Sequence, residues 1–450
     1  MSRTLDMTTG VIWKKILLFS VPLLLGNMFQ QLYNTVDSII LGNFVGKEAL
    51  AAAGCTSSVC ATVINFYNGI ALGAGVVAGF YFGEKNRVNL QKTIVTALMI
   101  SLLAGIVMTV LSIPAGPWFL RMMATPDEMF EMAAHYLQIF FIGTIFLFVY
   151  NTGGGLLRAM GDSKTPLYCL IATSFLNIVL DLFFVLYLHM GIEGTAIATV
   201  IAEAVSALMI MGALWRVRDV WQEEQITLSI DEGMTRRILR VGIPTGVQQA
   251  LTSFSNALLF SYVNAFNNTS ITAGWSAHVK LDQFAILPAQ SIGQAITTFV
   301  SQNIGAKDPK RAKEGTGIAI KMGILAIGMI ALLILLFAPV FVRLFNPDEE
   351  VIYYGSLFLR VMALFRILTP IFQGGLGALR GLGKSKTAMA IMVFSLVFAR
   401  QGYLYLITQV WNSVYAVALG YPVAWVVCDL ILLVYFLRFD WEAYAERRVV

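Results

Sequence analysis

Residues Gly153–Thr165 read GGGLLRAMGDSKT, and residues Gly375–Thr387 read GLGALRGLGKSKT, so that 8 of 13 positions are identical. The two segments lie 222 residues apart in a chain of 450 residues. The same offset aligns further residues, among them Pro22 with Pro244. Matches at one constant offset predict an internal duplication that covers the whole chain.

The composition places the chain in a membrane. Hydrophobic residues make up 58% of it and charged residues only 13%, with a mean hydropathy of +0.74. A water-soluble globule of this length has too little core to bury that much apolar surface. The net charge of +5 does not indicate a nucleic-acid partner, because the basic residues fall in short connections between apolar runs.

The fold that we predict is an all-α polytopic membrane protein with twelve transmembrane helices in two parallel six-helix repeats. Residues 1–222 form the N-terminal bundle and residues 223–450 the C-terminal bundle. Each repeat contains an even number of spans, so both repeats have the same orientation in the membrane. The spans are expected near residues 16–42, 50–82, 91–113, 129–157, 166–188, 195–215, 238–265, 271–303, 315–342, 351–379, 388–409 and 413–437.

Basic residues set the orientation of these spans. One side of the membrane receives 23 Lys and Arg residues from the N-terminus, the even-numbered connections and the C-terminal tail, and the other side receives three. Cytoplasmic connections carry the excess of Lys and Arg. We therefore expect a multi-pass protein with both termini in the cytoplasm.

Asp37 is an acid inside the first apolar run, Ile16–Gly42. The run has 27 residues, enough to cross a hydrocarbon core of about 30 Å. A carboxylate at the bilayer centre costs at least about 2.5 to 3.5 kcal/mol, so such a residue normally faces a protein interior and marks an ion or substrate path. The alternative is a structural carboxylate that polar neighbours on its own helix satisfy.

The two repeats differ at their acidic positions. Asp37 aligns with Leu259, and Asp181 aligns with Tyr403. Residues that both copies share serve the fold, whereas divergent polar residues are candidates for a specialised task. Counted from the ends of their spans, Asp37, Asp181 and Glu203 lie at similar depth, roughly 8 to 12 Å at the rise of an α-helix.

Spacing groups further polar residues with these acids. Asn177 and Asp181 share a helix face at i, i+4, and so do Thr199 and Glu203. Their oxygens suit a small hard cation, or a carboxylate that takes a proton, and the residues leave both choices open. The predicted cation-coupling site consists of Asp37, Asn177, Asp181, Thr199 and Glu203, with Na+ expected at Asp37 and Asp181 if sodium is the ion.

The second half has the opposite charge within its spans. Lys280, Arg360, Arg366 and Arg400 lie there, with Asp282 as the acid nearest to them. These cations either pair internally or hold an anionic or zwitterionic group of a substrate. On the internal-pairing reading, His278 and Asp282 at i, i+4 supply the partners. The predicted substrate cavity consists of Asn34, His278, Lys280, Asp282, Arg366 and Arg400.

Four motifs fall on the expected spans: QQLYNTVDSIILG, LLRAMGDSKTP, NIVLDLFF and GTAIATVIAE. With them the chain resembles bacterial multidrug and toxic compound extrusion (MATE) transporters of the multidrug/oligosaccharidyl-lipid/polysaccharide flippase superfamily. The resemblance implies an antiporter in the bacterial plasma membrane that exports amphipathic organic compounds in exchange for H+ or Na+ by alternating access. It also places the family's coupling residues on Asp37, Asn177, Asp181 and Thr199.

The chain departs from this family in two respects. Its seventh and tenth spans lack the acids of the sodium-driven branch, and its sixth span carries Glu203 where the family more often has an amide. Coupling through the first bundle is therefore favoured, and Glu203 is a candidate second titrating group.

One alternative function uses the same fold. A flippase of a lipid-linked oligosaccharide precursor would hold a pyrophosphate with the cations of the second half. An enzyme is not expected, because the sequence has no Walker loop and no His cluster of the metal-binding kind. We expect a monomer whose partners are a small-molecule substrate and the lipid bilayer, with no nucleic acid and with no cofactor besides the coupling ion, H+ or Na+.

Overall fold

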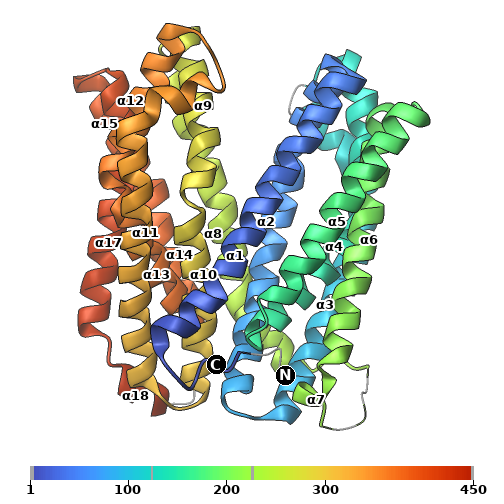
Figure 1. Cartoon of the computed structure of the whole chain (residues 1–450), viewed down its shortest axis with the longest axis vertical. Coiled ribbons are helices and arrows are strands. Elements are labelled where there is room, and N and C mark those ends of the chain that lie inside the picture. Colours follow the sequence, from blue (N-terminus) through green and yellow to red (C-terminus); the bar gives the residue numbers. More distant parts are fainter. Residues whose placement is uncertain (1–4, 123–124, 224, 226–227, 447–450) are drawn as a thin grey trace. The chain divides into compact units, whose positions relative to one another are not determined.

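The structure is a computed structural model that describes residues 5–122, 125–223, 225 and 228–446. Every regular element in these residues is a helix (Figure 1). The described chain divides into two compact units. The first contains Val21–Gly246, and the second contains Met7–Ser20 together with the chain from Val247 onward. The division falls within two helices, α1 (Ile12–Ile40) and α8 (Glu232–Asn264), so each of them contributes residues to both units.

The twelve predicted spans are all present as helical segments, which confirms the predicted fold class. The predicted repeat boundary between residues 222 and 223 stays a prediction. In the first half the elements are α1, η1 (Leu41–Val45), α2 (Lys47–Gly83), α3 (Arg87–Met122), α4 (Asp127–Ala159), α5 (Lys164–Leu182), η2 (Phe183–Tyr187), α6 (Gly191–Arg216) and the short α7 (Arg218–Trp221).

The second half repeats this order with more interruptions. Its elements are α8, α9 (Thr269–Ala285), α10 (Leu287–Gly305), α11 (Pro309–Arg343), α12 (Glu349–Phe365), η3 (Arg366–Leu368), α13 (Thr369–Gly381), α14 (Ser385–Val393), η4 (Phe394–Ala399), α15 (Arg400–Val410), α16 (Val414–Ala418), α17 (Gly420–Arg438) and α18 (Trp441–Glu446). Ten helical segments of the described chain are long and apolar enough to cross a membrane by themselves. The other two expected spans are α8 and the pair α9–α10.

Prolines account for two interruptions of the second half. Pro288 lies in the first turn of α10, directly after the break at Ile286. Pro370 lies in the first turn of α13, directly after the η3 turn. Proline lacks a backbone N–H and clashes with the carbonyl four residues earlier, so the α-helical hydrogen bonding stops at these points.

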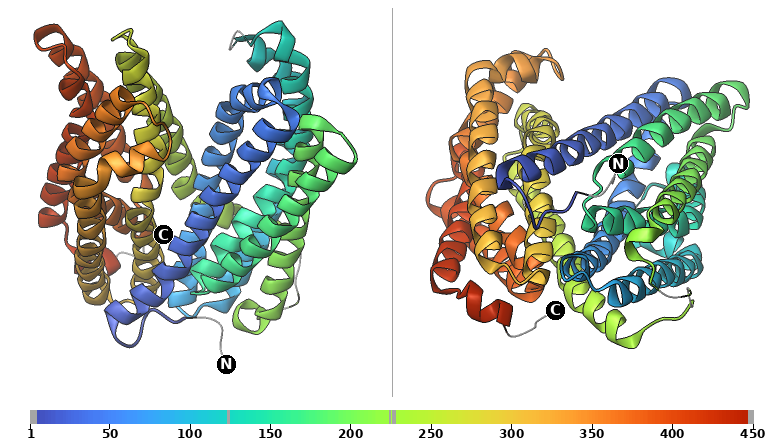
Figure 2. Two further views of the ribbon diagram at one scale, coloured as in Figure 1. Left: turned by 45° about the horizontal axis from the view of Figure 1, so that its top comes forward. Right: turned by 60° about the horizontal axis from the view of Figure 1, so that its bottom comes forward.

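Corresponding helices pack in the two units. In the first unit α4 contacts α2, α3 and α6, and in both views of Figure 2 the helices of this unit run alongside one another. In the second unit α10 contacts α11 and α13. A Cβ added at Gly155 would lie 3.1 Å from the carbonyl oxygen of Ala71, and one at Gly377 would overlap the carbonyl oxygen of Gly293. The same close helix crossing thus recurs at the repeat offset, and glycine permits it.

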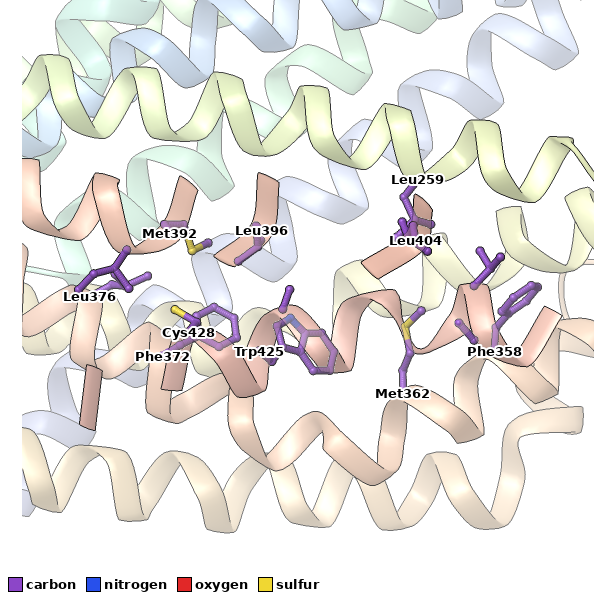
Figure 3. Close-up of a cluster of buried hydrophobic side chains, with 14 of the residues drawn as sticks. Leu259, Phe358, Met362, Phe372, Leu376, Met392, Leu396, Leu404, Trp425 and Cys428 are labelled. Atoms are coloured by element: carbon purple, nitrogen blue, oxygen red, sulfur yellow. The ribbon is translucent and has the colours of Figure 1, made fainter. Parts of the chain in front are cut away.

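The second unit has an extended apolar core. Figure 3 shows Leu259 next to Leu404, with Trp425, Phe372 and Cys428 further along the same cluster. Leu259 and Leu404 have no exposed surface. The position that aligns with Asp37 is therefore an apolar packing position in the second unit.

Candidate functional site

The two acids of the first unit each precede a π-helical turn. Asp37 lies in the last turn of α1, before η1, and Asp181 lies in the last turn of α5, before η2. The η1 and η2 turns contact each other. Single π-helical turns inside α-helices occur frequently at functional sites. The chain therefore brings the ends of its first and fifth spans together just where both carry an acid.

The carboxyl groups of Asp37 and Asp181 lie beside each other. Asp181 has no exposed surface, Asn177 is 1% exposed, and Asp37 is half-buried. The structure thus places Asp37 beside Asp181, with Asn177 one turn before Asp181 on α5. Two carboxylates so close together in a low-dielectric site either share a proton, which neutralises one of them, or require a cation between them.

The sixth span supplies the other predicted residues. Asn177 donates from Nδ2 to the hydroxyl of Thr199 at 3.4 Å, and Thr199 donates to the carbonyl of Thr195 at 3.0 Å. Glu203 lies one turn further on, where a Cβ added at Gly143 would come within 2.8 Å of its Oε2 atom. The missing side chain at Gly143 therefore leaves the room that the Glu203 carboxylate occupies between α4 and α6.

Most acceptor oxygens of this cluster lack a partner. Among the described residues, no hydrogen-bond donor reaches Oδ1 of Asp37, Oδ1 of Asn177, either carboxylate oxygen of Asp181, or Oε2 of Glu203. Buried oxygens without donors are costly, at about 1 to 3 kcal/mol each and more when charged. Within the described chain no three His, Cys, Asp or Glu residues form a metal-binding group. The chemistry that fits this set is the binding of protons, or of one small cation through mixed carboxylate, amide and hydroxyl oxygens.

Sequence reasoning missed two tyrosines of the cluster. The Tyr33 hydroxyl lies beside the Asp37 carboxyl and the Thr199 hydroxyl. Tyr136, on α4, lies within electrostatic range of the three acids. Tyr33 precedes Asp37 by four residues on one helix face, so its spacing was a usable signal. Tyr136 belongs to a different helix and carries no such signal.

The acid of the second unit pairs with one of the cations that the sequence places near it. Asp282 forms an ion pair with Arg366, which has no exposed surface. His278 is 1% exposed, and its Nδ1 atom has no partner in the described chain. The ion-pair partner of Asp282 is thus an arginine from another span, and the ring of His278 lies near the rings of Trp275 and Phe358.

Arg400 is the second fully buried cation of this unit. Its Nη1 donates to Oδ1 of Asn256 at 2.9 Å, and its Nη2 donates to the Ser255 hydroxyl at 2.6 Å. Its guanidinium also lies over the ring of Tyr421, 4.9 Å from the centroid. Polar and aromatic groups therefore hold Arg400, with no carboxylate paired to it in the described residues.

The remaining predicted residues of this group are exposed. Lys280 lies over the ring of Phe345, 5.9 Å from the centroid. Arg360 donates from Nε to the carbonyl of Leu335 at 3.3 Å. Asn34 lies on α1, in the first unit. Arg366 and Arg400 are thus the buried cations, and the part of Asn34 and Lys280 in a substrate cavity stays a prediction.

Three comparisons relate the chain to known proteins. The MatE family profile matches residues 22–183 and 244–400, and the two matched segments start 222 residues apart. The chain is 28% identical to the probable multidrug resistance protein YoeA of Bacillus subtilis (strain 168) over 447 residues, which are 98% of this chain and 96% of that protein. It is 24% identical to the probable multidrug resistance protein NorM of Thermotoga maritima over 441 residues, with 95% and 93% covered.

Solved structures with the same fold are also known. A crystal structure of a MATE protein in complex with MaL6 superimposes with a TM-score of 0.92 at 25% identity, covering 99% of this chain and 100% of that one.

Proposed function

The chain belongs to the MatE family, and from this membership we propose that it is a secondary antiporter driven through the acid cluster of its first unit. As a member of a transporter family it is a multi-pass membrane transporter and not an enzyme. Its cargo, by analogy with relatives named as multidrug resistance proteins, is an amphipathic organic compound. The exchanged ion is H+ or Na+.

One observation carries the proposal. Asp37 and Asp181 are adjacent acids within membrane-spanning helices, and neither carboxylate oxygen of Asp181 has a protein donor among the described residues. An arrangement that served only the fold would satisfy these oxygens, because unsatisfied charge in a membrane protein is expensive. A site that binds and releases a cation must leave them available.

The mechanism follows from the change in charge. When a proton or Na+ enters, the Asp37 and Asp181 carboxyl groups no longer repel each other, and the ends of α1 and α5 move closer together. When the ion leaves, repulsion separates them again. For Na+, the ligands are the oxygens of Asp37, Asn177, Asp181 and Thr199. A site of this kind couples ion binding to helix position, and alternating access links that movement to release of the cargo.

The proposal includes a setting in the bacterial plasma membrane with both termini in the cytoplasm. The excess of Lys and Arg in the connections on one side supports this orientation. The protein acts as a monomer in this proposal, because the predicted ion site lies within one chain.

Efflux from vesicles tests the proposal. Proteoliposomes that hold the zwitterionic dye rhodamine B are exposed separately to an imposed proton gradient and an imposed sodium gradient. We expect one gradient to drive efflux and Asp37→Asn to abolish it at matched protein levels. Glu193→Gln is the control, since Glu193 is an exposed acid of the same unit that pairs with His135 at 2.8 Å. Efflux that neither gradient drives, or full activity of Asp37→Asn, contradicts the proposal.

The same vesicles also address a lipid-linked cargo. If the substrate carries a lipid-linked pyrophosphate, that molecule competes with the dye and transport proceeds without either ion gradient. Absence of competition supports the antiporter.

A further inference from the structure

The second unit buries more positive than negative charge in one cluster. Arg366 and Arg400 have no exposed surface. Asp282 interacts electrostatically with Arg366 and with Tyr421, which lies against Arg400, and it is the one acid of the described chain that does so. Nε and Nη1 of Arg366 and Nε of Arg400 have no partner among the described residues. A buried cation without a counter-charge is strongly unfavourable, so this cluster is suited to receive an anion.

The backbone fixes Arg366 in this position. Pro370 has no N–H to give to the carbonyl of Arg366, four residues earlier, and the hydroxyl of Thr369 donates to that carbonyl at 2.8 Å instead. The helix tightens into the η3 turn at this point. Arg360, six residues earlier on α12, is exposed, whereas Arg366 is buried. Arg366 thus lies at the break between α12 and α13, on a different helix face from Arg360.

A second set of contacts fixes Arg400. Ser255 accepts from Nη2 of Arg400 and donates to the carbonyl of Leu396 in the η4 turn at 2.5 Å. Gln401 donates to the same hydroxyl at 2.9 Å. Arg400 thus cannot swing away from α8 without breaking this network, and its charge stays beside Asn256.

Asn256 links the buried Arg400 to the accessible surface. It is exposed, and its Oδ1 accepts both from Nη1 of Arg400 at 2.9 Å and from the Tyr421 hydroxyl at 3.2 Å. Its Nδ2 amide has no partner in the described chain. Because Oδ1 already binds a cation, the amide N–H groups are polarised and become stronger donors. Tyr421, which lies near Trp275 with ring centroids 6.2 Å apart, adds an aromatic wall.

We propose that Asn256, Tyr421 and the buried Arg400 form a subsite for a single carboxylate attached to an aromatic body. The carboxylate accepts from Nδ2 of Asn256, and the aromatic body packs against Tyr421. A cationic group is disfavoured there, because Arg366 already neutralises Asp282. This inference names the chemical class of the cargo and in that respect rests on the proposed export function. The binding itself does not depend on an ion gradient.

Binding of a matched pair of probes tests the subsite. The purified full chain in detergent is equilibrated by dialysis with 2-naphthoate or with 2-naphthamide, which has nearly the same shape and no charge. We expect 2-naphthoate to bind about tenfold more tightly, since a hydrogen bond to a charged group contributes at least about that factor. Equal affinity for the two probes, or binding of neither, overturns the proposal.

Two substitutions locate the binding. Asn256→Ala removes the exposed amide and should abolish the preference for 2-naphthoate. Asn264→Ala is its control, because Asn264 is an exposed asparagine on the same helix, where it accepts from Thr272. Retention of the preference in Asn256→Ala overturns the proposal even if Arg400 variants do not fold.

A second pair tests the role of the buried charge. Arg400→Gln should abolish the preference, whereas Arg360→Gln, which removes an exposed arginine, should keep it. If gradient-driven efflux fails while the wild-type chain prefers 2-naphthoate, the antiport proposal fails and the subsite stands.

Discussion

The end of the first span and its counterpart in the second repeat have the same backbone role and opposite chemistry. In the first unit Asp37 lies beside Asp181 with oxygens that lack donors. In the second unit Leu259 is buried in an apolar cluster, and Tyr403 donates to the carbonyl of Ala416 at 3.1 Å. One position of a duplicated fold therefore carries an acid of the proposed ion site in one copy and an apolar packing residue in the other. The fold alone does not determine the function of a site.

The largest expected effect comes from placing an acid at Leu259, the position of the second unit that aligns with Asp37. Leu259→Asp places a carboxylate among apolar side chains that offer it no donor, which costs several kcal/mol. We expect little folded protein, measured by size-exclusion chromatography and thermal denaturation. Leu259→Met, which keeps the volume, should fold almost normally. Combined with Asp37→Asn, Leu259→Asp should not restore efflux, and restored efflux would show that the two positions are interchangeable.

Next in size is the loss of transport when the pair of acids is neutralised. Asp37→Asn and Asp181→Asn should each stop gradient-driven efflux at matched protein levels, because either change removes one half of a shared charge site. The double variant should differ from the single variants by no more than about twofold, since residues that act as a unit are not additive. Additive losses of expression, with normal efflux per folded molecule, would return both acids to a structural role.

A smaller effect tests the glycine crossing that the repeats share. A methyl group at Gly377 would overlap the carbonyl oxygen of Gly293, whereas at Gly155 it would lie 3.1 Å from that of Ala71. Gly377→Ala should therefore destabilise the protein by about 1 to 3 kcal/mol, and Gly155→Ala should cost less. Thermal denaturation of both variants in one detergent measures the difference. Equal costs would mean that the second crossing relaxes as easily as the first.

The smallest effect concerns the tyrosine that replaces Asp181 in the second repeat. Tyr403→Phe removes one hydrogen bond, to the carbonyl of Ala416, and should cost about 1 kcal/mol with transport unchanged. Denaturation and dye efflux together check this. A loss of efflux without a loss of stability would give Tyr403 a role in transport.

Much of the fold, and the pair of acids in the proposed ion site, could be predicted from the chain itself. Hydropathy and the repeat offset located the spans, and the mismatch of Asp37 with Leu259 indicated the acids, because charge inside a span is rare and informative. Helix rotation could not be predicted in the same way. Arg360 and Arg366 belong to one expected span, yet only Arg366 is buried; residues six apart lie on different helix faces, and one sequence does not show which face is inward.

Two features of the ion site had no signal in one sequence. Tyr136 reaches the acids from α4, and its contact with them depends on how four helices pack. Composition does not mark the η1 and η2 turns, because η1 contains the poor helix formers Gly42 and Asn43 whereas η2 contains neither Gly nor Asn. Local propensity does not distinguish a π-helical turn from an α-helical one in such a run.

The η1 turn has a consequence for the length of the chain. A π-helical turn holds one residue more than an α-helical turn needs, so deletion of one residue within Leu41–Val45 converts η1 into ordinary α-helix. Because the π-helical turn takes up its extra residue within the turn, we expect this deletion to leave the direction of the chain at Gly46 nearly unchanged. Asp37 precedes the turn and keeps its place. The same holds for Asp181 and Phe183–Tyr187. Beside each acid the protein thus has one residue whose removal would shorten the chain without moving the acid.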